Sequence, residues 1–130
     1  MLELHEGIRY FPYVDTVGKL TIGVGRNLTD KGLAPSEVSF MLTNDVLEVE
    51  QALDVSIPWW RGLNEVRQLV LADMCFNLGI AGLLRFKNTL GHMQVGNYEL
   101  AADNMMLSKW ATQVGSRASK LSRMMRTGQE

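Results

Sequence analysis

The sequence predicts an α+β fold that is mainly helical, with a small antiparallel β-sheet lobe near the N-terminus, a larger helical lobe and a cleft between them. Residues 11–25, FPYVDTVGKLTIGVG, alternate aromatic and β-branched residues with turn formers, as short antiparallel strands do. From residue 35 onward, apolar residues recur at helical spacing. A chain of 130 residues is also long enough to bury a core.

We expect one domain over residues 1–130, in three consecutive parts. A first helix and the β-lobe occupy about 1–34, a linking helix about 35–54 and the helical lobe about 58–130. The first helix is predicted over residues 2–8, where Leu4 and Ile8 stand at helical spacing. Residues 15–18 predict a tight turn, residues 20–22 the following strand and residues 29–32 a loop.

The remaining segments predict helices. The linking helix begins at Pro35 with Glu37 in its first turn, although Ala34 is a poor cap. Residues 65–78 follow a cap at Asn64 and form the most apolar helix, which is therefore predicted to be central. Shorter helices are expected over 85–93 and 97–106, the second capped by Asn97, and Ser116 is predicted to cap a last helix over 117–127. The apolar stripe of the linking helix is Val38, Met41, Leu42, Val46, Val49 and Leu53.

Composition narrows the function classes. Apolar residues make up 46% and charged residues 21% of the chain, which excludes a disordered protein, and a net charge of −1 argues against a nucleic-acid partner. The charge is uneven: residues 1–57 hold four Lys/Arg against nine Asp/Glu, and residues 101–130 hold five against two. The basic C-terminal part fits either a solvated surface or a face that attracts anionic material.

The single cysteine, Cys75, permits no internal disulfide, and its place in the apolar run LVLADMCF predicts a core residue rather than a nucleophile. No signal peptide and no membrane span are visible. Without a His/Cys cluster, we expect no metal site. No cofactor is expected either.

Glu6, Asp15 and Thr21 form a candidate catalytic set. Cleavage of a glycosidic bond needs one carboxyl that stays protonated and one that stays ionised. Glu6 has apolar helical neighbours that would desolvate it, Asp15 lies in a polar turn with backbone donors, and the Thr21 hydroxyl is able to hold a water. The spacing alone fits equally well a solvated helix charge, a turn cap and a strand residue.

Three segments resemble the phage-type lysozymes, the muramidases typified by the endolysin of T-even bacteriophages. They are HEGIRYFPYVDTVGKLTIGVGRNL, PWWRGLNEVRQLVLADMCFNLGIAGLLRFKNTL and NYELAADNMMLSKWATQVGSRASKLSRMMRTG. The resemblance implies a monomer that hydrolyses the β-1,4 bond between N-acetylmuramic acid and N-acetylglucosamine in peptidoglycan strands, with inversion. It implies Glu6 as general acid, Asp15 as the carboxylate that positions water, and Thr21 as a second holder of that water.

The resemblance also implies supporting residues. Arg117 occupies the position of an arginine that pairs with the catalytic glutamate, and Arg26 stands where the typical phage protein has a histidine. Trp110 is predicted to fill the helical core, and the pair Trp59–Trp60 to pack before the central helix. The positions that match sugar contacts in the family are Asn27, Phe76, Thr89 and Asn104.

Two other functions remain compatible with the sequence: a non-hydrolytic peptidoglycan-binding module on the same scaffold, and a lytic transglycosylase that forms an anhydro sugar. The joint presence of Glu6, Asp15 and Thr21 favours hydrolysis over both. From the family we expect accumulation in the host cytoplasm and release to the cell wall through a partner such as a holin.

Overall fold

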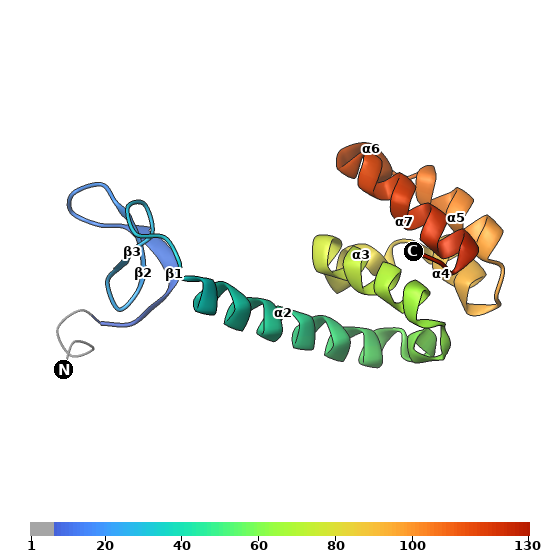
Figure 1. Ribbon diagram of the computed structural model, residues 1–130, viewed down its shortest axis with the longest axis horizontal. Helices are drawn as coiled ribbons and strands as arrows, with labels where there is room; N and C mark the ends of the chain where they lie inside the picture. Colours follow the sequence, from blue (N-terminus) through green and yellow to red (C-terminus); the bar gives the residue numbers. More distant parts are fainter. Residues whose placement is uncertain (1–6) are drawn as a thin grey trace. The chain divides into compact units, whose positions relative to one another are not determined.

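The computed structural model describes residues 7–130, which divide into two compact units (Figure 1). The first unit reaches to Leu42 and the second spans Thr43–Glu130. A small sheet lies in the first unit and most of the helices lie in the second, so the predicted α+β, mainly helical class is confirmed. The organisation as one domain stays a prediction.

The first unit contains a three-stranded antiparallel sheet in the order β1-β2-β3. Its strands are β1 (Arg9–Val14), β2 (Leu20–Gly23) and β3 (Arg26–Asn27). Thr21 of β2 lies opposite both Tyr13 of β1 and Asn27 of β3. The helix predicted over 2–8 falls largely on residues 1–6, which lie outside the described residues; residues 7 and 8 are not helical.

The turn between β1 and β2 forms where the sequence predicts it. The Gly18 N–H donates to the Asp15 carbonyl at 3.1 Å, and Gly18 has φ +84°, a conformation that glycine adopts without strain. The Asp15 N–H donates to the Lys19 carbonyl at 2.9 Å and closes the loop.

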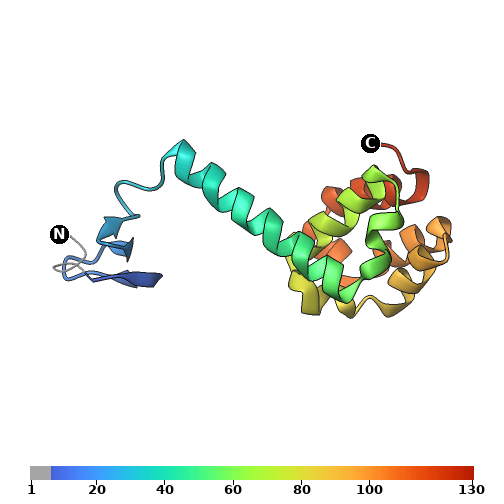
Figure 2. The ribbon, with the colours of Figure 1, turned by 90° about the horizontal axis from the view of Figure 1, so that it is seen from below.

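Helix α2 (Pro35–Ser56) is the predicted linking helix, and the boundary between the units falls within it (Figure 2). Ala34 has no capping side chain, but Glu37 Oε1 accepts the Ala34 N–H at 2.9 Å, which supplies half of a capping box. Of the predicted stripe, Leu53 is buried and Val49 packs against the core. Val38, Met41, Leu42 and Val46 are exposed, so most of the predicted stripe does not face the core.

The second unit packs short helices around one core (Figures 1 and 2). After α2 come η1 (Pro58–Gly62), α3 (Glu65–Leu84), α4 (Lys87–Gln94), α5 (Tyr98–Met106), α6 (Lys109–Val114) and α7 (Ser116–Thr127). Helix α7 packs against α3, α5 and α6. The largest fully buried side chains are Leu53, Ile57, Val70, Leu71, Met74, Leu83, Met93, Met105 and Met125.

Helix α3 is the central apolar helix. The predicted cap is confirmed, since Asn64 Oδ1 accepts the Arg67 N–H at 2.9 Å. The helix continues past residue 78 to Leu84, with one break at Gly79, whose φ of 73° and ψ of 162° are not helical. By length and composition alone α3 is able to cross a membrane, but a core helix meets the same criteria, and Val70 and Leu71 are fully buried here.

Two predicted caps are wrong and one α-helix was not predicted. Asn97 stands before α5 but makes no side-chain capping bond, and Ser116 is the first residue of α7, whose N-cap position is taken by Gly115. The unpredicted helix is α6, which Ser108 caps by accepting the Ala111 N–H at 3.2 Å. Gly115, with φ +58°, makes the sharp connection from α6 to α7.

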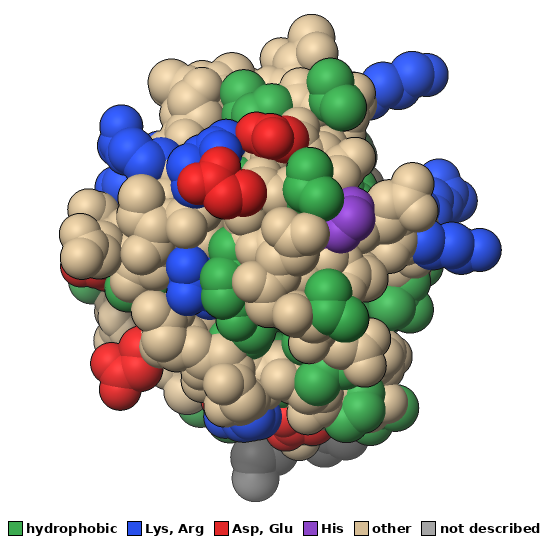
Figure 3. All heavy atoms as spheres, turned by 90° about the vertical axis from the view of Figure 1, so that its right-hand side faces the viewer, with side chains coloured by type: hydrophobic (Ala, Val, Ile, Leu, Met, Phe, Trp, Pro, Cys, Tyr) green, Lys and Arg blue, Asp and Glu red, His purple; other side chains and the backbone are tan. Residues whose placement is uncertain are grey.

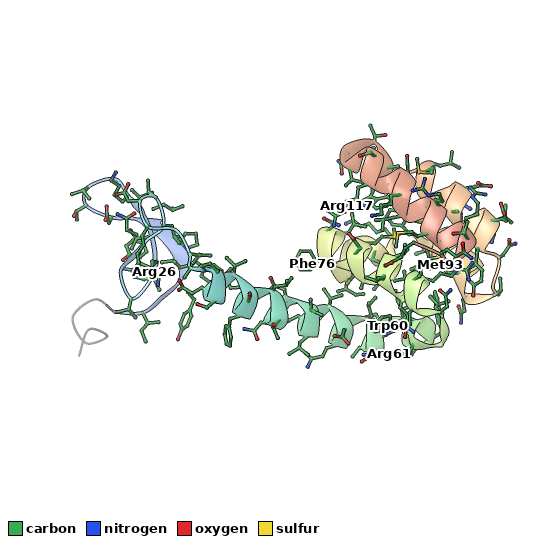
Figure 4. All side chains as sticks on the ribbon, viewed as in Figure 1. Arg26, Trp60, Arg61, Phe76, Met93 and Arg117 are labelled. Carbon is green, nitrogen blue, oxygen red and sulfur yellow. The ribbon has the colours of Figure 1, made fainter. Side chains whose placement is uncertain are left out.

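The predicted roles of three residues in the second unit are confirmed. Trp110 is 3% exposed and meets the Phe86 ring edge-on, with ring centroids 6.3 Å apart. Trp60 is also buried, beside Arg61 (Figure 4). Cys75 is a buried core residue, and burial raises the pKa of its thiol, which argues against a nucleophile.

Arg67 connects three helices at the C-terminal end of α7. Its Nε donates to the Met125 carbonyl at 2.8 Å and its Nη2 to the Arg126 carbonyl at 3.1 Å. Its guanidinium also lies 3.6 Å from the centre of the Tyr98 ring. These bonds satisfy carbonyls that the last turn of α7 leaves without helical partners.

Candidate active site

Asp15 lies in the β1–β2 turn, with its carboxylate held by the backbone. Oδ1 accepts the N–H groups of Val17 at 3.0 Å and Lys19 at 2.8 Å. The backbone donors that the sequence predicts for this carboxylate are therefore present. Oδ2 makes no hydrogen bond to any other residue in the range 7–130, so one oxygen remains open to a ligand.

Thr21 is brought to the same turn through Lys19. Its hydroxyl donates to the Lys19 carbonyl at 3.0 Å, and that carbonyl also accepts the Asp15 N–H. Asp15 thus binds the N–H of Lys19 while Thr21 binds its C=O. Thr21 is 3% exposed, and because its proton is given to Lys19, its oxygen is left as an acceptor.

Glu6, the predicted general acid, lies outside the described residues. Its role and its pairing with Arg117 stay predictions. The structure does describe Arg117, which reaches from α7 to two residues of α3 (Figure 4). Its Nη2 lies 2.6 Å from Asp73 Oδ1, and its Nη1 donates to Asn77 Oδ1 at 3.4 Å. Asn77 Nδ2 in turn donates to Asp73 Oδ1 at 2.8 Å, which closes a three-residue network.

The space-filling view of Figure 3 shows one face of the molecule, on which Lys and Arg side chains stand out at several places.

Thr89 and Asn104 line one pocket of about 260 Å³ in the second unit. Thr89 comes from the first turn of α4 and is 4% exposed, whereas Asn104 comes from α5. Asn104 Nδ2 donates to the Leu100 carbonyl at 2.9 Å, which leaves its Oδ1 as a free acceptor among the described residues. The structure therefore brings together two of the four predicted sugar contacts.

Phe76 borders a different pocket, of about 490 Å³, between α2 and α3. Phe76 is 50% exposed, so it is not a core residue (Figure 4). Asp45 and Glu48 of α2 line the same pocket. An apolar ring beside two carboxylates offers both a flat face and hydrogen-bond acceptors to a ligand.

Asn27 lines a pocket of about 570 Å³ within the first unit, but its side chain is committed to the adjacent loop. It accepts the Asp30 N–H and donates to Asp30 Oδ2, each at 3.0 Å. Arg26 in the same pocket donates to Glu37 Oε1 at 2.7 Å and ties β3 to α2 (Figure 4). The hydrogen bond from Arg26, supported by the Ala34 N–H, lowers the pKa of the Glu37 carboxyl.

Sequence reasoning missed four residues beside the predicted ones. Asp73 and Asn77 contact Arg117; their four-residue spacing on a predicted helix places them on one face and was an available signal. Arg85 and Lys87 line the pocket of Thr89 and Asn104. Among the described residues, no group of three or more His, Cys, Asp or Glu is placed to hold a metal ion.

Comparison with known sequences places the chain in a family. A sequence model described as phage lysozyme matches residues 3–128. The chain is 27% identical to the pre-baseplate central spike protein Gp5 of Enterobacteria phage T4, over 98% of this chain and 27% of that protein. It is 24% identical to probable T4-type lysozyme 2 of Dictyostelium discoideum, over 98% of this chain and 92% of that protein.

A third relative, the SAR-endolysin of Escherichia phage Mu, is 30% identical over 85% of this chain and 63% of its own length. The chain thus spans 27% of the spike protein and less than two thirds of this endolysin. The family match nevertheless covers nearly every residue, including Asp15, Thr21, Thr89, Asn104 and Arg117. This chain belongs to the phage lysozyme family, a family of peptidoglycan-lysing enzymes.

Proposed function

We propose that this enzyme hydrolyses the β-1,4 bond between N-acetylmuramic acid and N-acetylglucosamine in peptidoglycan, with inversion at the anomeric carbon. Family membership supports the lytic activity. The observation that carries the finer proposal is that Asp15 and Thr21 both hydrogen-bond to Lys19, because these bonds hold a carboxylate and a hydroxyl acceptor beside the same residue.

The turn supplies what an attacking water needs. Asp15 Oδ2 and Thr21 Oγ1 are both hydrogen-bond acceptors. A water molecule that donates one hydrogen bond to each of them therefore points a lone pair of its own oxygen away from both residues. Asp15 takes up the proton that the water loses on attack, and its negative charge stabilises the positive charge that develops on the sugar. The two backbone donors keep Asp15 Oδ1 engaged, which fixes the direction of Oδ2.

Glu6 is the proposed general acid, which protonates the leaving glycosidic oxygen. In an inverting enzyme the acid and the base stand roughly 6.5–9.5 Å apart, which leaves room for the water. Arg117 is proposed to pair with Glu6 while Asp73 and Asn77 hold the guanidinium from α3.

Thr89 and Asn104 are proposed to bind the acetamido and hydroxyl groups of the sugar. The Thr89 hydroxyl is able to donate to a carbonyl, and Asn104 Oδ1 is able to accept from an amide or a hydroxyl. Phe76 is proposed to offer its exposed ring to the apolar face of a sugar. Asn27 is proposed to contact substrate through its backbone, because its side chain already binds Asp30.

Analysis of the released muropeptides tests the proposal. The enzyme is incubated with purified peptidoglycan, and the products are identified by mass spectrometry, with Glu6→Gln as the inactive control. Hydrolysis gives reducing N-acetylmuramic acid ends, and a proton NMR spectrum taken within the first minutes shows the α-anomer if the reaction inverts. Anhydro ends would identify a transglycosylase instead, and the absence of any product would leave a binding module.

Where the protein acts follows from the same function. We propose that it is a monomer that accumulates in the host cytoplasm and reaches the wall when a partner such as a holin opens the membrane. Reducing ends that appear in infected cells only after the membrane is permeabilised would support this route. Their release while the membrane is intact would contradict it.

A further inference from the structure

The start of β2 is bound by the loop that follows β3. Leu20 is the residue between Lys19 and Thr21, so its position sets the positions of both. Its N–H donates to Thr29 Oγ1 at 2.8 Å, and its carbonyl accepts the Leu28 N–H at 2.7 Å. Two consecutive residues of the loop therefore bind both backbone polar groups of Leu20.

The Thr29 hydroxyl takes the place of a backbone carbonyl in this pairing. The register of β2 and β3, continued by one residue, sets Leu20 opposite Leu28. In a regular antiparallel pair two such residues exchange both N–H···O bonds. Here the Leu28 carbonyl accepts the Gly32 N–H at 3.2 Å, because the chain turns away after β3. The Leu20 N–H is bound by Thr29 Oγ1 instead, so one side chain completes the pairing at the end of β2 nearest the catalytic turn.

The loop that presents Thr29 is closed by its own hydrogen bonds. Asn27 accepts the Asp30 N–H through its side chain and the Lys31 N–H through its carbonyl, each at 3.0 Å. Asp30 Oδ1 also lies 3.3 Å from Lys19 Nζ, but both side chains are more than a third exposed, and ion pairs of this kind contribute little. The Thr29 hydroxyl is therefore the stronger side-chain bond between this loop and the start of β2.

We propose that Thr29 is a positioning residue for the reaction and acts through Leu20. Its hydroxyl fixes the start of β2, and thereby the spacing at which Asp15 and Thr21 bind the attacking water. The inference rests on the proposed function, because that function assigns the water to these two residues. Thr29 itself touches neither the water nor the sugar. A displacement of about 1 Å between groups that position a reactant lowers a rate by as much as about 10²-fold, so the loss of one such bond is measurable.

Hydrogen exchange tests the positioning without turnover. Thr29→Val keeps the shape of the side chain but removes the acceptor of the Leu20 N–H, whereas Thr29→Ser keeps the acceptor. We expect the Leu20 amide to exchange about tenfold faster in Thr29→Val than in the wild type, and at close to the wild-type rate in Thr29→Ser. Equal exchange rates in all three proteins would show that Thr29 does not hold Leu20, and would overturn the inference.

Steady-state kinetics on purified peptidoglycan test the consequence for the reaction. We expect Thr29→Val to lower kcat about tenfold with little change in KM, because substrate binding is kept while the attack of water is impaired. Thr29→Ser should keep most of kcat. Losses of kcat that are equal in the two variants, or a Thr29→Val enzyme with unchanged kcat, would contradict the role of the hydroxyl.

Thr127 provides a matched control in the second unit. Its Oγ1 likewise accepts a backbone N–H, that of Gln129 at 3.2 Å, at the end of α7. Thr127→Val therefore removes a hydrogen bond of the same kind from a part of the chain outside the proposed site, and should leave both kcat and KM unchanged. A loss of kcat in Thr127→Val as large as that in Thr29→Val would overturn the inference.

A double-mutant cycle distinguishes positioning of the water from a general effect on stability. In Thr21→Val the water has already lost one of its two acceptors, so adding Thr29→Val should lower kcat by less than about threefold. The same tenfold factor in both backgrounds would show that Thr29 acts elsewhere. Failure of the proposed function would appear differently, as no reducing ends from the wild-type enzyme, while exchange of the Leu20 amide would still report the bond to Thr29.

Discussion

Arg117 Nη2 lies 2.6 Å from Asp73 Oδ1, so the cation that the family resemblance assigns to Glu6 is already shared with a carboxylate of α3. Asp73 is less exposed than its partner, with 28% of its side chain accessible against 49% for Arg117. Asn77 binds both groups and fixes their relative orientation. Asp73 thereby offsets part of the positive charge that Arg117 presents.

We expect Asp73→Asn to change the pH dependence of the reaction. Under the proposed pairing of Arg117 with Glu6, loss of the Asp73 charge leaves more uncompensated positive charge beside the acid and favours its ionised form. The acid is then protonated only at lower pH, so the alkaline limb of the kcat/KM profile should move to lower pH. Asp103→Asn, which breaks the pair with Arg126 instead, should leave that limb in place. An unmoved limb in Asp73→Asn would contradict the shared-charge argument.

Substitutions at Asp15 and Thr21 should distinguish the role of the proposed base from that of the residue that holds the attacking water. Asp15→Ala removes the proposed base and should lower kcat by about 10²–10⁴-fold. Thr21→Ser keeps the hydroxyl and should keep most of the reaction rate. Thr21→Val keeps the shape of the side chain but not the hydroxyl, and should lose most of the rate. Both Thr21 variants should fold, because the Lys19 carbonyl still accepts the Asp15 N–H. Initial rates of reducing-end release provide the measurement, and equal rates for Ser and Val would exclude a role for the hydroxyl.

Arg67→Ala should destabilise the helical unit. The change removes two hydrogen bonds to the end of α7 and the contact with Tyr98, for a loss of about 1–3 kcal/mol in the free energy of unfolding. Thermal unfolding followed by circular dichroism measures the effect. Arg123→Ala, on exposed α7 surface, is the control and should melt as the wild type does.

Replacement of glycine by alanine should have opposite effects on the free energy of unfolding at two positions. Gly79→Ala places a side chain at φ 73° and ψ 162°, a region for glycine, and should cost about 1–3 kcal/mol. Gly91 lies inside α4, where an added methyl group would have open space around it, so Gly91→Ala should stabilise the protein by about 0.5–1 kcal/mol. Denaturant unfolding of both variants gives the comparison, and a Gly79→Ala protein as stable as the wild type would show that the break in α3 is not required.

The Arg26–Glu37 pair should contribute stability in a defined pH window. The folded-state pKa of Glu37 is lowered from its ordinary value of 4.5, first by Arg26 and then by the Ala34 N–H. Such a group contributes its stability in full above the unfolded pKa and loses it as the pH falls through the folded pKa. The difference in melting temperature between wild type and Glu37→Gln should therefore be present at about pH 6 and shrink steadily below pH 4.5. A melting-temperature difference between the two proteins that grows on acidification would contradict this prediction.

Local chemistry explains which parts of the fold the sequence predicts. The Asp15–Gly18 turn and the Asn64 cap depend on neighbours within a few residues, so the pattern identifies both. Helix α6 has six residues, too few to show a periodic pattern. The cap predicted at Asn97 fails because its φ of −90° and ψ of 70° are not the extended backbone that a capping side chain needs.

The same distinction applies to the candidate site. Asp15 and Thr21 both bind Lys19 because one short turn leads from β1 into β2, which sequence reasoning can follow. The contact between Arg117 and Asp73 joins residues 44 apart and depends on how α7 packs against α3. The shared pocket of Thr89 and Asn104 likewise depends on helix packing, so only the family resemblance pointed to these two residues before the structure did.

The chain's three tryptophans, Trp59, Trp60 and Trp110, all belong to the unit Thr43–Glu130. Indole fluorescence therefore follows the loss of the helical core and carries no signal from the sheet. Backbone amide resonances of β1, β2 and β3 follow the other unit. Urea titrations recorded with both probes will show, by coincident or separate midpoints, whether the two halves of this enzyme unfold in one cooperative step.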